Sequence, residues 1–407
     1  MLRHERIPFV SYPYEWTFGM LRDAALLQLD LQLAALAEGM TLKDATPYNV
    51  QFRGAEPTFI DIGSFEVLPE GSPWVGYRQF CMLNLYPLLL QAYKDVPFHP
   101  WLRGSIDGIA PTDAAKLFGF RDRFRKGVFM HVAMHGRMER RNQAREGGDV
   151  RRDLKEAKFK PEMIEANVRG LRKLVAGLTW KAGETAWTGY RADNTYSDDD
   201  AARKQEFVRA VAAEARPPLV WDMGCNDGAY SRIAAESAEQ VIAFDYDHAT
   251  VDAFYRSLRT ARLAGADADA GTPSADAARD ARILPLVANL ADPSPGLGWR
   301  GLERRTLEDR GSPDLVLALA LIHHVSITAN VPIAEFLDWL RGLECAAVIE
   351  FPKREDPMVQ RLLSGKGEGA NADYDHENFE ARLRERFQVA GSKQLPSNTR
   401  LLYHVHP

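Results

Sequence analysis

The stretch Val220–Ala235 reads VWDMGCNDGAYSRIAA, and it decides the fold of this chain. An apolar run ends at Asp222, the glycines Gly224 and Gly228 follow, and a helical pattern then begins. Glycine lets a ligand approach the backbone closely because it has no side chain, and a helix N-terminus offers N–H groups to that ligand. The spacing G-x-x-x-G, with an acid two residues earlier, differs from the dinucleotide fingerprint G-x-G-x-x-G. The stretch predicts a nucleotide-type binding turn between a strand and a helix.

Apolar strands alternate with helical patterns from this turn to the end of the chain. Near-continuous apolar strands separated by helices are typical of a parallel sheet that is covered on both faces. The last two stretches, joined by a turn at 396–398, are expected to pair antiparallel. We therefore expect an α/β fold with a mostly parallel seven-stranded sheet and helices on both faces. The expected strands lie at 219–222, 240–245, 283–289, 314–321, 346–351, 387–393 and 399–405.

The turn resembles the first motif of class I S-adenosylmethionine-dependent methyltransferases, D-x-G-x-G-x-G, with Asn226 at the position of the middle glycine. A small polar residue tolerates unusual backbone angles. The resemblance runs from about Lys204 to the C-terminus, and it includes the terminal antiparallel strands that distinguish this fold from an NAD-binding one. It implies a Rossmann-like domain that binds S-adenosyl-L-methionine. The cofactor-binding residues that it implies in the turn are Asp222, Gly224, Cys225, Asn226 and Gly228.

Two later strand ends extend this predicted cofactor site. Asp245 lies 23 positions after the acid of the turn, where it can accept hydrogen bonds from both ribose hydroxyls, and Asp247 is the alternative. By the same resemblance, Asn289 and Leu290 lie where the adenine is held, with Asp292 as a substitute. Such a turn can also be only a tight connection, and an Asp at a strand end only a helix cap. Their order on successive strands favours a cofactor site.

Polar residues after the fourth strand and within the fifth are the candidates for catalysis. His323 and His324 lie at the carboxyl end of the strand predicted at 314–321, the edge where open α/β sheets bind ligands. Because the sulfonium is an activated methyl donor, the protein mainly aligns the acceptor and removes its proton, and a histidine can be that base. Glu350 is a second candidate for contacting the acceptor. The alternative is that one histidine packs or bonds to backbone while the other lines the pocket.

A second resemblance lies in LKDATPYNVQFRGAEPTFIDIGSFE, residues 42–66. The pattern D-x-x-x-x-N, followed twelve positions later by D-I-G, is similar to the catalytic loop and metal-binding turn of protein kinases and aminoglycoside-type phosphotransferases. It implies Asp44 at a substrate hydroxyl and Asn49 and Asp61 at magnesium. Only 43 residues precede Asp44, too few for the smaller lobe, so we expect a truncated kinase-like module. A helix and hairpin with turn-forming Asp and Asn is the alternative.

The composition divides the chain into three expected parts: a mainly helical, kinase-large-lobe-like domain at 1–140, a charged linker and helical lid at 141–200, and the methyltransferase domain at 201–407. Aromatic faces attract a cationic sulfonium, so the aromatics of the middle part either form a lid or pack between domains. These aromatics are Trp180, Trp187, Tyr190 and Tyr196. The other predicted features are a helix over 16–42, a hairpin within 44–65, helices over 77–93, 112–138 and 204–215, and an unstructured insertion over 261–280.

The net charge bears on the class of substrate, and the cysteine content bears on the cellular compartment. A net charge of −5 argues against binding to a nucleic-acid backbone and favours a small-molecule or glycan-type acceptor. The three cysteines, Cys81, Cys225 and Cys345, lack the spacing of a zinc site or a disulfide framework. No signal peptide is evident, and no stretch approaches the roughly 18 apolar residues of a membrane span. We expect a cytoplasmic protein without a metal.

The sequence as a whole predicts an S-adenosylmethionine-dependent methyltransferase. A bifunctional kinase and methyltransferase and a non-catalytic cofactor-binding scaffold are the alternatives. The acceptor, the element that is methylated and the oligomeric state are left open by the sequence.

Overall fold

The computed structural model describes residues 4–143, 159–182, 197–267, 274–367, 369 and 371–407. The chain divides into two compact units. The β/α unit comprises Met1–Val10, Arg53–Ala55 and Glu184–Pro407, and the helical unit comprises Ser11–Phe52 and Glu56–Gly183. Part of the predicted linker, 144–158, and the predicted lid aromatics Trp187, Tyr190 and Tyr196 lie outside the described residues.

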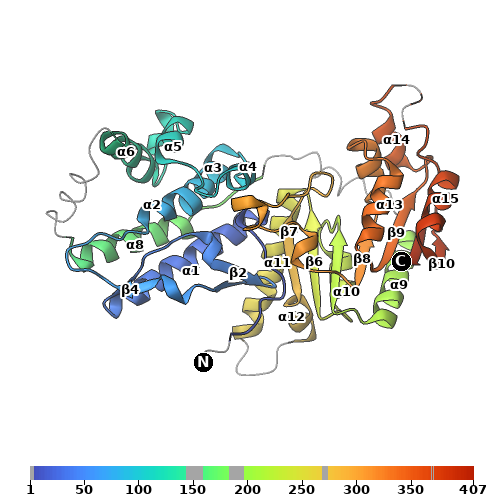
Figure 1. The fold of residues 1–407 in the computed structure, drawn as a ribbon, viewed down its shortest axis with the longest axis horizontal. Coiled ribbons are helices and arrows are strands. Elements are labelled where there is room, and N and C mark those ends of the chain that lie inside the picture. The colour runs from blue at the N-terminus through green and yellow to red at the C-terminus, as the bar shows by residue number, and fades with distance from the viewer. Residues whose placement is uncertain (1–3, 144–158, 183–196, 268–273, 368, 370) are drawn as a thin grey trace. The chain divides into compact units, whose positions relative to one another are not determined.

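A seven-stranded sheet forms the centre of the β/α unit (Figure 1). Its order is β10-β11-β9-β8-β5-β6-β7, and β11 alone runs against the other strands. The expected mostly parallel sheet is therefore confirmed. The strands are β5 (Leu219–Met223), β6 (Gln240–Asp245), β7 (Ile283–Val287), β8 (Leu315–Ala318), β9 (Ala346–Pro352), β10 (Gln388–Gln394) and β11 (Arg400–His406).

Helices flank this sheet, and apolar strand residues fill the space between the layers (Figure 1). Trp221 on β5 and Phe244 on β6 are buried, and the ring of Phe9 meets both edge-on at 6.4 and 6.3 Å. The helices are α9 (Asp198–Ala215), α10 (Ala229–Ala234), α11 (His248–Asp267), α12 (Ala275–Asp280), η7 (Trp299–Gly301), η8 (Glu308–Arg310), η9 (His324–Thr328), α13 (Ile333–Gly342), α14 (Pro357–Leu363) and α15 (His376–Arg386).

The strand order reverses at β5. The chain passes from β5 to β6 and β7 on one side, and then returns to β8 and β9 on the other side. In open α/β sheets such a switch point leaves a crevice at the carboxyl ends of the strands, and ligands bind there. The fold therefore places the residues that follow β5, β6 and β8 at the edge where a ligand site is expected.

The helical unit is built around α1, with two small two-stranded sheets, β1-β4 and β2-β3. Its elements are η1 (Pro13–Glu15), α1 (Phe18–Ala37), β1 (Met40–Leu42), η2 (Pro47–Asn49), β2 (Val50–Arg53), β3 (Glu56–Phe59), η3 (Ile62–Ser64), β4 (Phe65–Val67), α2 (Tyr77–Phe80), η4 (Cys81–Leu85), α3 (Tyr86–Lys94), α4 (His99–Gly104), α5 (Pro111–Leu117), η5 (Arg121–Phe124), η6 (Val128–Met134), α6 (His135–Gln143) and α8 (Pro161–Ala176).

Several predicted elements are shorter than expected or are interrupted. In each case a residue with a positive φ lies at or near the break. The helix predicted over 16–42 ends at Ala37, because Gly39 has φ +70° and the chain then enters β1. The helix predicted over 112–138 is not continuous: α5 ends at Leu117, and η6 begins only after Gly127, which has φ +81° and where a Cβ would lie 2.3 Å from the Leu174 side chain. The strand predicted to reach Leu321 ends at Ala318, two residues before Ala320 with φ +50°.

Two further expectations need correction. The predicted helix at 77–93 has a π-helical segment, η4, at its centre, and such segments occur often at functional sites. The described residues of the insertion predicted to be unstructured over 261–280 are almost all helical, because α11 continues to Asp267 and α12 begins at Ala275. Ser274 caps α12 by accepting a hydrogen bond from the Ala277 N–H.

Candidate cofactor and active site

The glycine turn after β5 adopts the backbone that its sequence requires. Gly224, Asn226 and Gly228 have φ values of +82°, +49° and +80°. Asparagine is among the side chains that tolerate this region, so its presence at the middle position costs little. The two glycines differ in their surroundings. A Cβ on Gly228 would lie 2.0 Å from the Phe254 ring, whereas one on Gly224 would meet only the Leu321 side chain, at 3.6 Å.

Asp245, at the end of β6, contacts this turn directly. Its Oδ2 accepts a hydrogen bond from the Asn226 N–H at 2.9 Å, and its Oδ1 accepts one from the Asp247 N–H at 2.9 Å. Burial raises the pKa of the Asp245 carboxyl, while these backbone donors act in the opposite direction. The alternative acid, Asp247, has a structural task, because its Oδ1 caps α11 by accepting from the Ala249 and Thr250 N–H groups.

Asn289 and Leu290 follow β7, next to the end of β6. The Ala288 N–H donates to the Asp245 carbonyl at 2.9 Å, which holds the start of this loop beside the predicted ribose-binding acid. Asn289 is exposed, and its Oδ1 accepts from the Ala291 N–H at 3.1 Å. Their predicted adenine-binding role stays a prediction.

Asp222, the acid at the end of β5, is buried beneath the turn. The Ser231 hydroxyl on α10 donates to its Oδ2 at 2.5 Å. Burial raises the pKa of Asp222 to about 6, against the lowering effects of Ser231 and the nearby Lys204. Such a position holds the turn against α10. The expectation of several free backbone donors is only partly met, because Gly224 and Cys225 N–H both donate to the Phe244 carbonyl, at 2.8 and 2.9 Å.

The histidine pair follows β8 at the same edge of the sheet. Leu321, two residues before His323, is the side chain nearest to Gly224, so the histidine segment lies beside the glycine turn. His323 is completely buried, and neither ring nitrogen has a hydrogen-bond partner among the described residues. Its ring centroid lies 4.2 Å from that of His324.

Both imidazoles are neutral near pH 7. Burial holds the pKa of His323 well below its usual range, and the charges of His324, Arg400 and Lys204 act in the same direction. Burial also lowers the pKa of His324, to about 4. A buried, neutral and unsatisfied imidazole can accept a hydrogen bond from an incoming group.

Glu350 belongs to a buried cluster of charges that the sequence did not reveal. Its side chain pairs with the Lys204 Nζ at 2.6 Å and with the Arg400 guanidinium at 3.3 Å. Arg400 also bonds to Asp356 at 2.7 and 3.0 Å. The Lys204 ammonium lies 4.4 Å from the centre of the Tyr230 ring, on the helix after the glycine turn. The role predicted for Glu350 at the acceptor stays a prediction.

Lys204, Tyr230, Asp356 and Arg400 are the residues of this edge that sequence reasoning missed. Lys204 carried a usable signal, because it lies on the buried face of α9 together with Val208, Val211 and Ala212. A lysine on an apolar helical face requires a buried partner. The sequence gives no comparable signal for Arg400, because its partners are brought to it only by the pairing of β11 with β9.

In the helical unit, two of the three residues of the kinase-like motif come together. Ser64 links them, because the Asn49 Nδ2 donates to its hydroxyl at 3.0 Å and that hydroxyl donates to the Asp61 Oδ2 at 2.6 Å. Asp44 is half-buried on the preceding loop. Within the described parts of the chain, no group of three His, Cys, Asp or Glu side chains could hold a metal ion. No described helix is long and apolar enough to cross a membrane.

The strand order, with β11 inserted antiparallel between β9 and β10, and the glycine turn after the central strand define a methyltransferase-like α/β fold. The chain belongs to the family of the nodulation protein NoeA. It is 36% identical over 406 residues to NoeA of Rhizobium meliloti (strain 1021), and the match covers 99% of this chain and 81% of that protein. No family model matches the chain.

Two solved structures cover about half of this chain. The N-methyltransferase NodS from Bradyrhizobium japonicum WM9 is 11% identical, with a TM-score of 0.34, over 52% of this chain and 97% of that one. Magnesium protoporphyrin IX methyltransferase (ChlM) from Synechocystis PCC 6803, with bound SAH, is 20% identical, with a TM-score of 0.33, over 54% of this chain and 95% of that one.

Proposed function

We propose that the β/α unit binds S-adenosyl-L-methionine and transfers its methyl group to an acceptor of small-molecule or glycan type. The observation that carries this proposal is the contact between Asp245 and the glycine turn, 2.9 Å from carboxylate oxygen to the Asn226 nitrogen. It joins the predicted ribose-binding acid to the predicted nucleotide-type binding turn, at the point where the strand order reverses.

The residues present suit this cofactor. A Cβ on Gly224 would meet only the Leu321 side chain, at an ordinary contact distance of 3.6 Å, and a glycine lets a ligand approach its backbone closely. Asp245 can accept hydrogen bonds from the two ribose hydroxyls, and Asn289 and Leu290 follow the neighbouring strand on the adenine side. When bound, the cofactor supplies an electrophilic methyl group; the protein supplies alignment.

We assign His323 to the acceptor. Its imidazole is buried, neutral and without a hydrogen-bond partner among the described residues. A neutral imidazole accepts a hydrogen bond from a hydroxyl or amine and thereby orients the lone pair of that group. Because the pKa of His323 lies well below its usual range, it is a weak base, and we expect its main contribution to be orientation.

The acceptor class follows from charge. The chain has a net charge of −5, which favours a neutral or weakly charged acceptor over a nucleic acid. The name of the Rhizobium meliloti relative connects that protein with nodulation. We also assign the chain to the cytoplasm, since Cys81, Cys225 and Cys345 are buried free thiols, as suits a reducing compartment.

Calorimetric titration with S-adenosylmethionine and its demethylated product tests the proposal. The Asp245→Ala variant should lose about a hundredfold or more in affinity, because two hydrogen bonds to a charged group disappear. The matched control is Asp314→Ala. Asp314 accepts a hydrogen bond from the Leu219 N–H at 2.8 Å, at the opposite end of β5, and its loss should leave affinity unchanged. No binding by the wild-type protein would overturn the proposal.

Binding without turnover would favour the scaffold alternative. A bifunctional kinase and methyltransferase is the second candidate, and the meeting of Asn49 and Asp61 at Ser64 is the observation that favours it. Titration with ATP and magnesium, on the wild type and on Asp61→Asn, tests it. Magnesium-dependent binding that the substitution removes would support a kinase-like module, and no binding would reject it.

A further inference from the structure

The surface of the helical unit formed by η5, η6 and α6 combines exposed apolar and basic side chains. Met130, Met134 and Met138 recur at a spacing of four residues, so they share one helical face, and all three are exposed. Val132 and Gly136 lie on the opposite, buried face. A Cβ on Gly136 would lie 2.7 Å from that of Ala115 on α5, so close packing fixes the methionine face outward.

Phenylalanines continue this apolar surface on the preceding turn. Phe120 is 70% exposed and Phe124 is 82% exposed, with ring centroids 5.9 Å apart, and Phe129 is also exposed. The Arg123 guanidinium lies 5.5 Å from the centre of the Phe120 ring. Exposure of two neighbouring aromatic rings to water is energetically unfavourable, and contiguous exposed apolar surface of this kind marks an interaction site.

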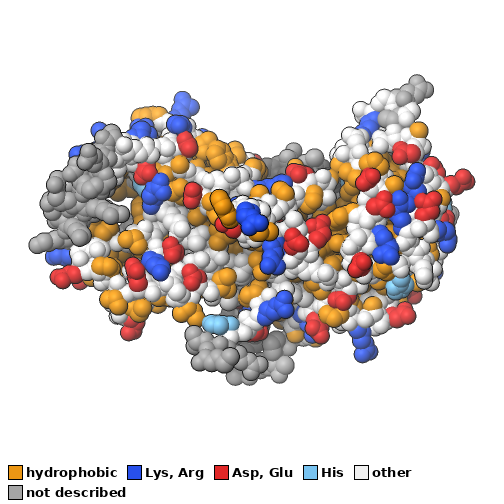
Figure 2. Space-filling view, viewed as in Figure 1, with side chains coloured by type: hydrophobic (Ala, Val, Ile, Leu, Met, Phe, Trp, Pro, Cys, Tyr) orange, Lys and Arg blue, Asp and Glu red, His pale blue; other side chains and the backbone are white. Residues whose placement is uncertain are grey.

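Basic residues accompany the apolar ones. Residues 121–141 hold seven Lys or Arg and two acids, a surplus of five positive charges in a chain whose net charge is −5. Both acids pair with cations outside this stretch, Asp122 with Lys94 at 2.7 Å and Glu139 with Arg78 at 2.8 Å; Asp122 also pairs with Arg125, within the stretch, at 3.6 Å. In Figure 2, hydrophobic and basic side chains lie next to one another over the α5 end of the helical unit. The basic residues are Arg121, Arg123, Arg125, Lys126, Arg137, Arg140 and Arg141.

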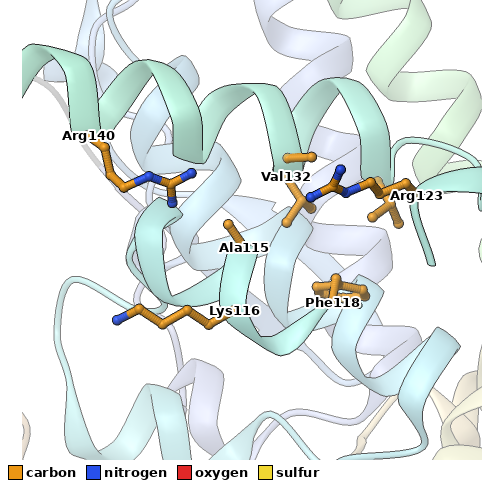
Figure 3. A pocket seen from close by; sticks show the side chains of 8 residues that line it. Ala115, Lys116, Phe118, Arg123, Val132 and Arg140 are labelled. Carbon is orange, nitrogen blue, oxygen red and sulfur yellow. The ribbon is translucent and has the colours of Figure 1, made fainter. Parts of the chain in front are cut away.

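A small pocket of about 80 Å³ lies between α5 and the η6–α6 helix. Arg123 and Arg140 point toward one another across it, and Lys116 lies on α5 below (Figure 3). Phe118 and Val132 are also among the residues that line it. Two guanidinium groups at one pocket suit an anionic headgroup.

We propose that this surface, the η5–α6 face, binds the anionic surface of a lipid bilayer. The exposed Phe and Met side chains enter the boundary between headgroups and acyl chains, and the Arg and Lys side chains meet the lipid phosphates. A nucleic-acid backbone would use the positive charges but would leave the methionine face without a partner. The membrane is therefore the occupant that accounts for both kinds of side chain. The binding is peripheral and is independent of the methyl-transfer proposal.

Sedimentation of the full chain with vesicles tests this inference. One set of vesicles contains phosphatidylcholine alone, and the other contains phosphatidylcholine with phosphatidylglycerol. The wild type should sediment with the anionic set, and added salt should reduce that fraction. The double variant Phe120→Ser, Phe124→Ser should bind about tenfold more weakly, as should Arg137→Gln with Arg141→Gln.

The matched control is Trp299→Ser with Leu302→Ser, which removes two exposed apolar side chains from the β/α unit. It should bind vesicles like the wild type. All substituted side chains are exposed, so circular dichroism should show unchanged folding. Failure of the wild type to bind anionic vesicles would overturn the inference. Equal loss in the control, or binding of single-stranded RNA without binding of vesicles, would overturn it as well.

Discussion

Both units carry a pair of histidines at a π-helical segment, but His323 has surroundings opposite to those of the pair in the helical unit. In the helical unit, His131 bonds through Nδ1 to the Tyr77 hydroxyl at 2.8 Å, and His135 bonds through Nδ1 to the Tyr86 hydroxyl at 2.7 Å. In the β/α unit, both ring nitrogens of His323 lack a partner among the described residues. A satisfied polar cluster stabilises a fold, whereas an unsatisfied buried group indicates a site for something else.

The buried charge cluster around Glu350 should show the largest effect on stability. Glu350→Gln leaves Lys204 and Arg400 without a full counter-charge in a buried place, and this should cost about 3–5 kcal/mol in the free energy of unfolding. Denaturation in urea measures the change. The control Asp338→Asn breaks an exposed pair with Arg386 and should cost less than about 1 kcal/mol. A small effect of Glu350→Gln would show that the cluster does not stabilise this edge.

Removing one hydroxyl from the satisfied cluster should have the next largest effect. The Tyr86 hydroxyl donates to the His131 carbonyl at 2.8 Å and bonds to His135, so Tyr86→Phe removes a hydrogen bond from each of two half-buried residues. We expect a loss of about 2–3 kcal/mol in urea denaturation. Tyr93→Phe, which removes an exposed bond to the Lys126 carbonyl at 3.1 Å, is the matched control and should be nearly neutral.

Acid should weaken both units over the same pH range. Burial lowers the pKa of His324 and of His131 to about 4, whereas an unfolded histidine takes up its proton near pH 6.5. The stability that each contributes is present above about pH 6.5 and is lost as the pH falls toward 4, with a loss of about 2 kcal/mol at about pH 5.

His324→Gln and His131→Gln should each make the free energy of unfolding depend less on pH. The comparison is made between each variant and the wild type, because Asp222, whose pKa burial raises to about 6, changes stability in the opposite direction. Urea denaturation across the pH range measures the slopes. Identical slopes in variant and wild type would show that the histidine is already protonated or already exposed.

His323 should be the least costly of the buried histidines to replace. His323→Leu breaks no hydrogen bond of the described residues, so the free energy of unfolding should change by less than about 1 kcal/mol. His135→Leu removes the partner of Tyr86 and should cost clearly more. If the two substitutions cost the same, the difference in hydrogen bonding between His323 and His135 has no effect on stability.

The mostly parallel sheet and the glycine turn could be predicted from the sequence, because both depend on local patterns. Asn226 takes the left-handed backbone expected of it, and Asp245 meets the turn. The buried charge cluster could not be predicted from the sequence. Lys204, Glu350 and Arg400 come from α9, β9 and β11, which only the fold brings together. The π-helical segments could not be predicted, because the hydrophobic pattern of a helix does not show where a turn holds one extra residue.

Crosslinking tests the central claim most directly, because it locates the cofactor in one unit or the other. The full chain is irradiated with tritium-labelled S-adenosylmethionine, digested, and the labelled peptide is identified by mass spectrometry, with excess demethylated product as the competitor. We predict label in peptides from the glycine turn at 222–228 or the loop at 288–292, suppressed by the competitor. Label in the helical unit, around Asn49 and Asp61, would contradict the assignment of the cofactor site to the β/α unit.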